Sequence, residues 1–348
     1  MRDRRKKQRR SVEARHAAVR ELPTVELRHH AVLSGRPGEE RVAASVGPDG
    51  HVIALWAAAR DVPALTSTTT KAGWATFPDP RTSRPVAARV SIHTPEPTTV
   101  ADLRELNLAH TTVQPLPGGR TLVVGARSRF RAESPDRNAV IYDSEGNVVA
   151  EATVGDGIEH VLTTPTGHIW VGYFDEGVYG NYGWGEGEAP GPIGASGLVR
   201  FAPDLRADWH FPLDPGLSGG AISDCYALNV DGETAWTCYY TDFPIVRVRD
   251  DALTGWRNPV RGPKALAVEG SRAALLGGYA PERDRLAVGA LEDGDFHVTG
   301  EYRVVLPDGQ PLPAEVQLLG RGPDLHVLTG SDWYRLGLEH GRTGAAWA

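Results

Sequence analysis

Glu159, His160 and Asp224 are titratable residues that open two separate β-rich runs of the sequence. Two carboxylates and an imidazole can act together as general base and general acid, or supply ligands to a divalent cation such as Ca²⁺ or Zn²⁺. Glu159 and Asp224 would be the oxygen ligands or the base, and His160 the general acid or a nitrogen ligand. All three are therefore candidate catalytic residues, and the two carboxylates form a candidate metal site.

Whether these side chains meet depends on the local strand geometry. Glu159 and His160 are adjacent, so a regular strand would point them to opposite sides of the sheet. A β-bulge or an irregular strand start would bring both to one site. The alternative is a structural role, in which Glu159, His160 and Asp224 hydrogen-bond backbone groups and neighbouring sheets.

The sequence around these residues repeats one local pattern six times. A run rich in Val, Ile, Leu, Thr and aromatic residues meets a tight turn with glycine, and a second such run follows. This pattern predicts short β-hairpins. The six hairpins span 41–58, 111–126, 159–174, 225–240, 264–279 and 315–330.

Two more strand-like segments follow each of the first five hairpins, so each unit has four antiparallel strands, named a to d from the centre outward. Strand-rich repeats of about 40–55 residues predict a β-propeller. Only one strand, 331–338, follows the last hairpin, and we expect 24–32 to complete that blade and close the ring. The predicted fold is all-β, with one six-bladed β-propeller over 24–340. A basic tail at 1–23, expected to be disordered, and a short tail at 341–348 flank it.

The predicted connections differ in length between the two faces of the ring. Turns a–b and c–d lie on one face and are short, whereas loops b–c and d–a lie on the other and include all the long ones. Long loops in a compact domain are often functional. We therefore expect a binding face around the mouth of the central channel, where each strand a begins. The long loops are 59–84, 127–137, 174–196, 213–221 and 306–313.

The loop 174–196 combines aromatic residues, carboxylates and many glycines. Aromatic faces beside carboxylates suit a sugar, a cationic ligand or a peptide. The alternative is that the aromatic residues cover their own blade as local core. The candidate ligand-binding residues on this face are His110, Arg129, Tyr173, Asp175, Glu176, Tyr182, Trp184, Tyr226, Asp242 and Lys264.

One blade carries a recognisable repeat. GHIWVGYFDEGVYG at 167–180, followed by SGLVRFAPDL at 196–205, resembles regulator-type propeller repeats, in which G-x-I-W-V-G precedes G-L-x-R-F. The resemblance implies blade packing and no chemistry. The chain as a whole looks like a bacterial-type propeller protein.

The predicted ring also resembles the six-bladed superfold that includes gluconolactonase-like hydrolases and sugar- or peptide-binding propellers. The gluconolactonase-like pattern implies a Glu, an Asp and two Asn around one divalent cation. Glu159 and Asp224 match it, but Asn107, Asn181 and Asn229 do not lie at equivalent strand starts. The resemblance is architectural and transfers no function.

Charge is unevenly distributed along the chain. The formal net charge is −7, yet residues 1–20 contain nine Lys or Arg and two acids, so the remainder carries a net charge of −14. Because the body is acidic, we do not expect the folded domain to bind nucleic acid; only the basic tail could do so. No apolar stretch is long enough for a transmembrane helix, and no secretory signal is visible, so the sequence predicts a cytoplasmic protein without a membrane partner.

Cys225 and Cys238 are equidistant from the centre of the Asp231–Gly232 turn, which places them opposite each other across the fourth hairpin. A cross-strand disulfide would then be within geometric reach. In the predicted cytoplasmic compartment we expect reduced thiols that pack as small apolar residues.

The sequence favours a non-catalytic propeller that binds a small molecule, a sugar or a peptide on its long-loop face, with a protein as a further candidate partner. No cofactor is expected for that function. The alternative is a metal-assisted hydrolase, lyase or epimerase with Glu159, His160 and Asp224 at the channel mouth and one divalent cation, Ca²⁺ or Zn²⁺.

Overall fold

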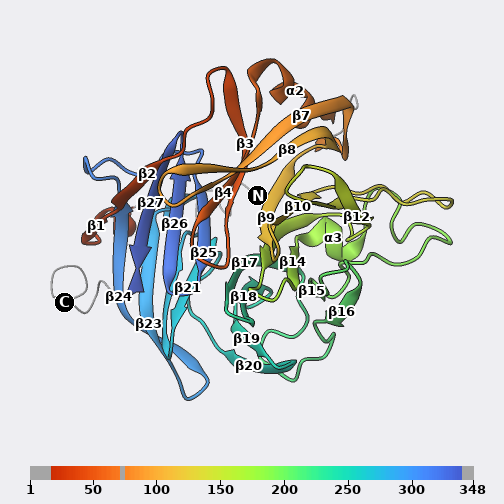
Figure 1. Ribbon diagram of the computed structural model, residues 1–348. Helices are drawn as coiled ribbons and strands as arrows, with labels where there is room; N and C mark the ends of the chain where they lie inside the picture. Colours follow the sequence, from red (N-terminus) through yellow and green to blue (C-terminus); the bar gives the residue numbers. More distant parts are fainter. Residues whose placement is uncertain (1–16, 71–74, 339–348) are drawn as a thin grey trace, which may run out of the picture.

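The structure is a computed structural model that describes residues 17–70 and 75–338. Six sheets surround a common centre in sequence order, coloured from orange to blue in Figure 1; each has four antiparallel strands, and one of them carries a fifth, parallel strand. The predicted six-bladed β-propeller is confirmed.

The first two blades use strands in sequence order. Blade one contains β3 (Glu39–Val46), β4 (Val52–Ala58), β7 (Arg81–His93) and β8 (Pro97–Leu108). Blade two contains β9 (Thr111–Leu116), β10 (Arg120–Gly125), β11 (Ala139–Tyr142) and β12 (Val148–Ala152).

The next two blades follow the same order. Blade three contains β13 (Ile158–Thr163), β14 (Ile169–Tyr173), β15 (Leu198–Phe201) and β16 (Ala207–His210). Blade four contains β17 (Asp224–Asp231), β18 (Thr234–Tyr240), β19 (Ile245–Arg249) and β20 (Ala252–Trp256).

The last two blades receive strands from the N-terminal part of the chain. Blade five contains β21 (Ala265–Glu269), β22 (Arg272–Leu276), β23 (Arg285–Glu292) and β24 (Asp295–Val305), with β1 (Thr24–Glu26) parallel to β24. Blade six contains β25 (Gln317–Arg321), β26 (Asp324–Thr329) and β27 (Asp332–Gly337), with β2 (Arg28–Val32) antiparallel to β27. Figure 1 shows β2 beside β27, so the ring closes by pairing the two ends of the propeller.

The sequence predicted a single closing strand over 24–32, but the structure divides this segment into two strands, β1 and β2. The chain changes blades at Leu27, whose side chain is buried and whose backbone N–H donates to the Val305 carbonyl at 2.9 Å. Residues before Leu27 extend blade five, and residues after it complete blade six. The N-terminal part therefore holds two neighbouring blades together.

Apolar residues pack between neighbouring blades rather than within one blade. The inner strand β4 is buried along almost its whole length, whereas the outer strand β16 alternates between intermediate and exposed residues. Each hydrophobic cluster combines two adjacent blades: Trp170 of blade three, for example, packs with Val246 of blade four. Burying a large apolar side chain stabilises the fold by about 1.5–3 kcal/mol, so these contacts hold the ring together.

The long loops lie on one face, as predicted. The b–c connections on this face contain the short elements η1 (Ala59–Asp61), α2 (Val62–Leu65), β5 (Thr68–Thr70), β6 (Thr76–Pro78), α3 (Asp175–Tyr179) and η2 (Ala280–Glu282). Strand alternation requires this placement, because every b–c and d–a connection leaves an antiparallel blade at the same end.

One expectation about the N-terminal end of the chain changes. Residues 17–20, assigned to the tail, form a helical turn, and Val19 is buried and lines a cavity together with residues of blade five. Residues 1–16, which carry most of the basic charge, and residues 339–348 lie outside the described residues. No helix in the described part is long and apolar enough to cross a membrane.

The two cysteines do not face each other directly. Cys225 pairs with Tyr239 and Cys238 pairs with Ala227, because the register shifts between Cys225 and Ala227. Both thiols are free and buried, and burial raises their pKa values.

Candidate functional site

β-Bulges deform the start of the innermost strand in blades three and four. In β13, Ile158 pairs with Tyr173 and His160 pairs with Gly172, so Glu159 is an extra residue. Tyr226 occupies the corresponding place in β17. The irregular strand start that the sequence required for Glu159 and His160 is present. A bulge releases neighbouring side chains from strict alternation, so both residues can face the channel mouth.

A small cavity of about 40 Å³ opens in the central channel, and Glu159, His160, Lys264 and Gln317 contribute to its lining. The Nε2 atom of His160 is buried and has no hydrogen-bond partner among the described residues. Burial lowers the pKa of His160, and the nearby Lys264 ammonium lowers it further, against the opposing effect of Glu159. The imidazole is therefore neutral near pH 7.

Asp224 belongs to the same electrostatic group. Its pKa is raised to about 6, chiefly by partial burial; the Lys264 ammonium opposes this shift, and the negative charges of Glu159 and Asp175 add to it. Asp175 begins α3 and is exposed, with its Oδ1 accepting a hydrogen bond from the Glu176 backbone N–H at 2.8 Å. The mouth thus combines three carboxylates with one ammonium group.

Tyrosines form one side of the mouth. The Lys264 Nζ atom lies 4.5 Å from the centre of the Tyr226 ring, and the hydroxyls of Tyr226 and Tyr279 are 3.4 Å apart. Tyr240 and Tyr279 both contact the ring of Phe243, which also packs on Tyr226. We call Tyr226, Tyr240 and Tyr279 the tyrosine rim. Sequence reasoning missed Tyr240 and Tyr279, although both border b–c loops.

The channel is filled by polar side chains toward the short-turn face. Asn229 of blade four donates to the carbonyls of Leu266 and Gly322, at 2.7 and 2.9 Å. Arg321 of blade six donates to the Thr163 carbonyl at 2.6 Å. These bonds connect distant blades, so the mouth leads into a shallow recess.

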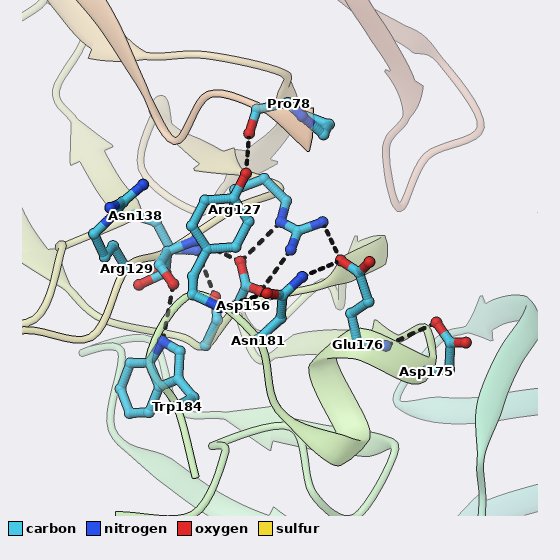
Figure 2. A network of polar contacts seen from close by, with 12 residues as sticks. Pro78, Arg127, Arg129, Asn138, Asp156, Asp175, Glu176, Asn181 and Trp184 are labelled. Carbon is cyan, nitrogen blue, oxygen red and sulfur yellow. Dashed lines mark hydrogen bonds and ion pairs between the residues drawn. The ribbon is translucent and has the colours of Figure 1, made fainter. Parts of the chain in front are cut away.

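A second polar network lies under the loops of blades two and three, shown in Figure 2. The buried Arg127 guanidinium forms a two-point ion pair with Asp156, at 2.9 and 2.8 Å, and its Nη1 lies 2.6 Å from Glu176 Oε2. Asn181 donates to the same Glu176 oxygen at 2.7 Å, and Arg127 lies over the Tyr182 ring at 4.4 Å. Glu176 and Tyr182 are therefore occupied in holding a buried arginine.

Close packing explains how α3 is placed beside this network. Gly157 has a φ of +66°, and a Cβ atom there would lie 2.3 Å from the Gly177 backbone nitrogen. Only glycine allows the two backbones to approach so closely. This contact sets α3 against blade three, where Glu176 pairs with Arg127 and the charge of Asp175 acts on Asp224.

Two predicted ligand-binding residues require correction. Tyr173 is completely buried, and its hydroxyl donates to the Val154 carbonyl. Trp184 is only 4% exposed, and its indole N–H donates to the Ser128 carbonyl at 2.8 Å. Both rings belong to the local core, because the 174–196 loop folds down onto the blades. Neither presents a surface to a ligand.

The remaining predicted residues lie apart from one another on the long-loop face. His110 Nε2 is 2.7 Å from the Ser67 carbonyl, so its imidazole secures the 59–80 loop. Arg129 is exposed over Tyr182, 5.2 Å from the ring centre. Asp242 is exposed in the short b–c turn of blade four. The structure therefore groups Glu159, His160, Asp175, Asp224, Tyr226 and Lys264 and leaves the others outside that group.

Within the described ranges, no group of three or more His, Cys, Asp or Glu side chains is arranged to hold a metal ion. Glu159 and Asp224 are two carboxylates, and a Ca²⁺ ion takes six to eight oxygen ligands. Among the described residues, no third His, Cys, Asp or Glu joins these two carboxylates in an arrangement that could hold an ion.

Comparison with family models and with curated proteins found no match. Among solved structures, the Dos1 propeller is 8% identical with a TM-score of 0.45, over 92% of this chain and 96% of that chain. A catalytically inactive virginiamycin B lyase from Staphylococcus aureus, solved with quinupristin, is 10% identical (TM-score 0.42; 90% of this chain, 100% of that chain). Apo AztD from Citrobacter koseri is 13% identical (TM-score 0.38; 86% of this chain, 80% of that chain). Likeness at this level carries no functional argument, so function rests on the site.

Proposed function

We propose that this protein is a non-catalytic binding protein that receives a ligand with a cationic group, such as a basic peptide or a small amine, at its channel mouth. One observation carries the proposal: an ammonium group, that of Lys264, already lies over the face of Tyr226 beside Asp224. A tyrosine face attracts a cation through its quadrupole, and nearby carboxylates add Coulomb attraction. The mouth therefore recognises positive charge within the molecule itself.

The balance of charges supports a cationic ligand. Glu159, Asp175 and Asp224 contribute three carboxylates against Lys264. The exposed rings of Tyr240 and Tyr279 extend the aromatic surface beyond the position of Lys264. A cationic ligand would contact these rings and carboxylates, whereas an acidic ligand would be repelled. A neutral sugar would gain stacking contacts with the aromatic rings but no attraction from the carboxylate charges.

The test is isothermal titration of the full chain with three probes: trilysine, triglutamate and maltotriose. We expect trilysine to bind and the other two to bind at least tenfold more weakly. Asp224→Asn and Tyr240→Leu should each weaken trilysine binding several-fold. Asp250→Asn is the matched control, because Asp250 is 94% exposed in a c–d turn on the opposite face. Equal affinity for trilysine and triglutamate contradicts the proposal.

A catalytic function is the second candidate, and a specific observation favours it. Asp224 has a pKa of about 6, and the buried Nε2 of His160 has no protein partner in the described chain. Each of these groups could transfer a proton near neutral pH, with or without a cation at Glu159 and Asp224. Titration of metal-free protein with Ca²⁺ and Zn²⁺ tests the metal-assisted form. An unchanged melting temperature would count against it.

The remaining expectations about the setting of the protein stay proposals. We infer a cytoplasmic protein in which the basic N-terminal residues supply any contact with nucleic acid and the propeller supplies none. Fractionation of tagged protein and nucleic-acid binding by a variant lacking residues 1–16 test these two points separately.

A further inference from the structure

A second polar cavity, of about 370 Å³, lies at the edge of blade five and apart from the channel mouth. Arg20, Arg283 and Arg303 line it together with Asp284. The three arginines come from separate segments: the N-terminal turn, the b–c loop of blade five and the end of β24. Three guanidinium groups thus line one cavity in a chain whose net charge is −7.

The pairing of strands shows why Arg303 lacks a carboxylate. Arg303 pairs with Arg285 across β23 and β24, so the two arginines lie side by side on the sheet. Arg285 takes both nearby acids, with Nη1 3.3 Å from Glu282 and Nη2 paired with Glu301. The Nε atom of Arg303 is buried and has no hydrogen-bond partner among the described residues.

The other two arginines are also available. Arg283 donates through Nη2 to the Leu312 carbonyl at 3.0 Å, which fixes the side chain without neutralising its charge. Arg20 is exposed at the rim of the cavity. None of the ion pairs found within residues 17–70 and 75–338 includes Arg20, Arg283 or Arg303. With Asp284 counted, the lining carries a formal charge of +2.

We propose that this cavity binds a phosphate group, either free or as part of a phosphorylated small molecule. A phosphate dianion matches the charge of the lining, and guanidinium groups bind phosphate oxygens through two parallel hydrogen bonds. An oxygen acceptor would also satisfy the buried Arg303 Nε, which is costly to leave unpaired. The volume lies in the range of small-molecule sites, which leaves room for an organic group beside the phosphate.

This site is independent of the proposed function of the mouth. The mouth is acidic and would repel phosphate, whereas the blade-five cavity would repel a cationic ligand. Binding of trilysine and binding of phosphate can therefore each fail without affecting the other.

The experiment titrates the full chain with inorganic phosphate and with glycerol phosphate, at an ionic strength held constant with sodium chloride. We expect saturable binding and a rise in melting temperature beyond that in sodium chloride alone. The exposed pair Arg20→Ala and Arg283→Ala, combined in one variant, should weaken binding at least tenfold. Arg60→Ala is the matched control, because the Arg60 side chain is 86% exposed and remote in sequence from the cavity.

The outcomes separate the two sources of phosphate. Tighter binding of glycerol phosphate identifies an organic phosphate, and equal or weaker binding identifies free phosphate; both support the site. The proposal is overturned if neither probe binds, or if the double variant binds as tightly as the unmodified chain. Circular dichroism of each variant confirms that its fold is intact.

Discussion

Arg321 in blade six donates a 2.6 Å hydrogen bond to the carbonyl of Thr163 in blade three, the blade on the opposite side of the ring. The guanidinium is buried, burial lowers its pKa to about 10, and its Nη1 has no partner among the described residues. One side chain therefore spans the channel below the mouth and limits its depth.

Removing this bridge should destabilise the ring. We expect Arg321→Ala to lower the free energy of unfolding by about 2–4 kcal/mol, because it leaves a cavity and an unpaired Thr163 carbonyl. Arg321→Met fills most of the volume and should cost less. Urea denaturation measures both values. An alanine variant as stable as the parent would mean that the bridge contributes no stability.

Arg127→Met should be more damaging, because it leaves Asp156 buried and without its cation. Breaking a buried ion pair from one side costs about 3–5 kcal/mol. Adding Asp156→Asn removes the stranded charge and should restore part of the lost stability. Thermal melts of the single and double variants test this. A double variant less stable than the single one would contradict the explanation.

Two buried histidines should make the protein sensitive to acid. Burial lowers the pKa of His93 to about 4 and that of His326 to about 3. The unfolded chain, with histidine pKa values near 6.5, therefore binds more protons below that pH than the folded chain does. Stability should be highest above pH 6.5 and fall by a few kcal/mol as the pH drops toward 4.

Substitution of both histidines separates their contribution to the loss of stability at acid pH from the contribution of the carboxylates. We expect His93→Gln and His326→Gln, combined, to flatten the decline in unfolding free energy between pH 6.5 and 4, whatever the variant costs at pH 7. A decline as steep as that of the parent would show that other groups cause it. Urea melts at several pH values provide the measurement.

Asp224 should have the opposite effect on stability. Its folded pKa of about 6 is above the ordinary value, so its charge disfavours folding as the pH rises through that window. Because the side chain is only half buried, we expect Asp224→Asn to stabilise the protein by less than about 1 kcal/mol at pH 7 and to have no such effect at pH 4. The same variant should bind trilysine more weakly. A loss of stability at pH 7 would contradict this account.

The blades and their faces could be predicted because the signals are local. Alternation of strand residues and glycine turns repeats within each unit, and antiparallel order then sends every long loop to one face. The strand starts placed Glu159, His160, Asp224, Tyr226 and Lys264 at the mouth for the same reason.

Other features depend on contacts between segments far apart in the sequence. Tyr173 and Trp184 are buried because a long loop folds back on the blades. Cys225 and Cys238 are offset because of a β-bulge that strand periodicity does not show. The blade change at Leu27 and the unpaired charge of Arg303 follow from which strand becomes the neighbour. Short-range pattern determined the elements of this protein, and only tertiary packing decided which side chains remain free, because desolvation and pairing depend on neighbours brought together by the closed ring.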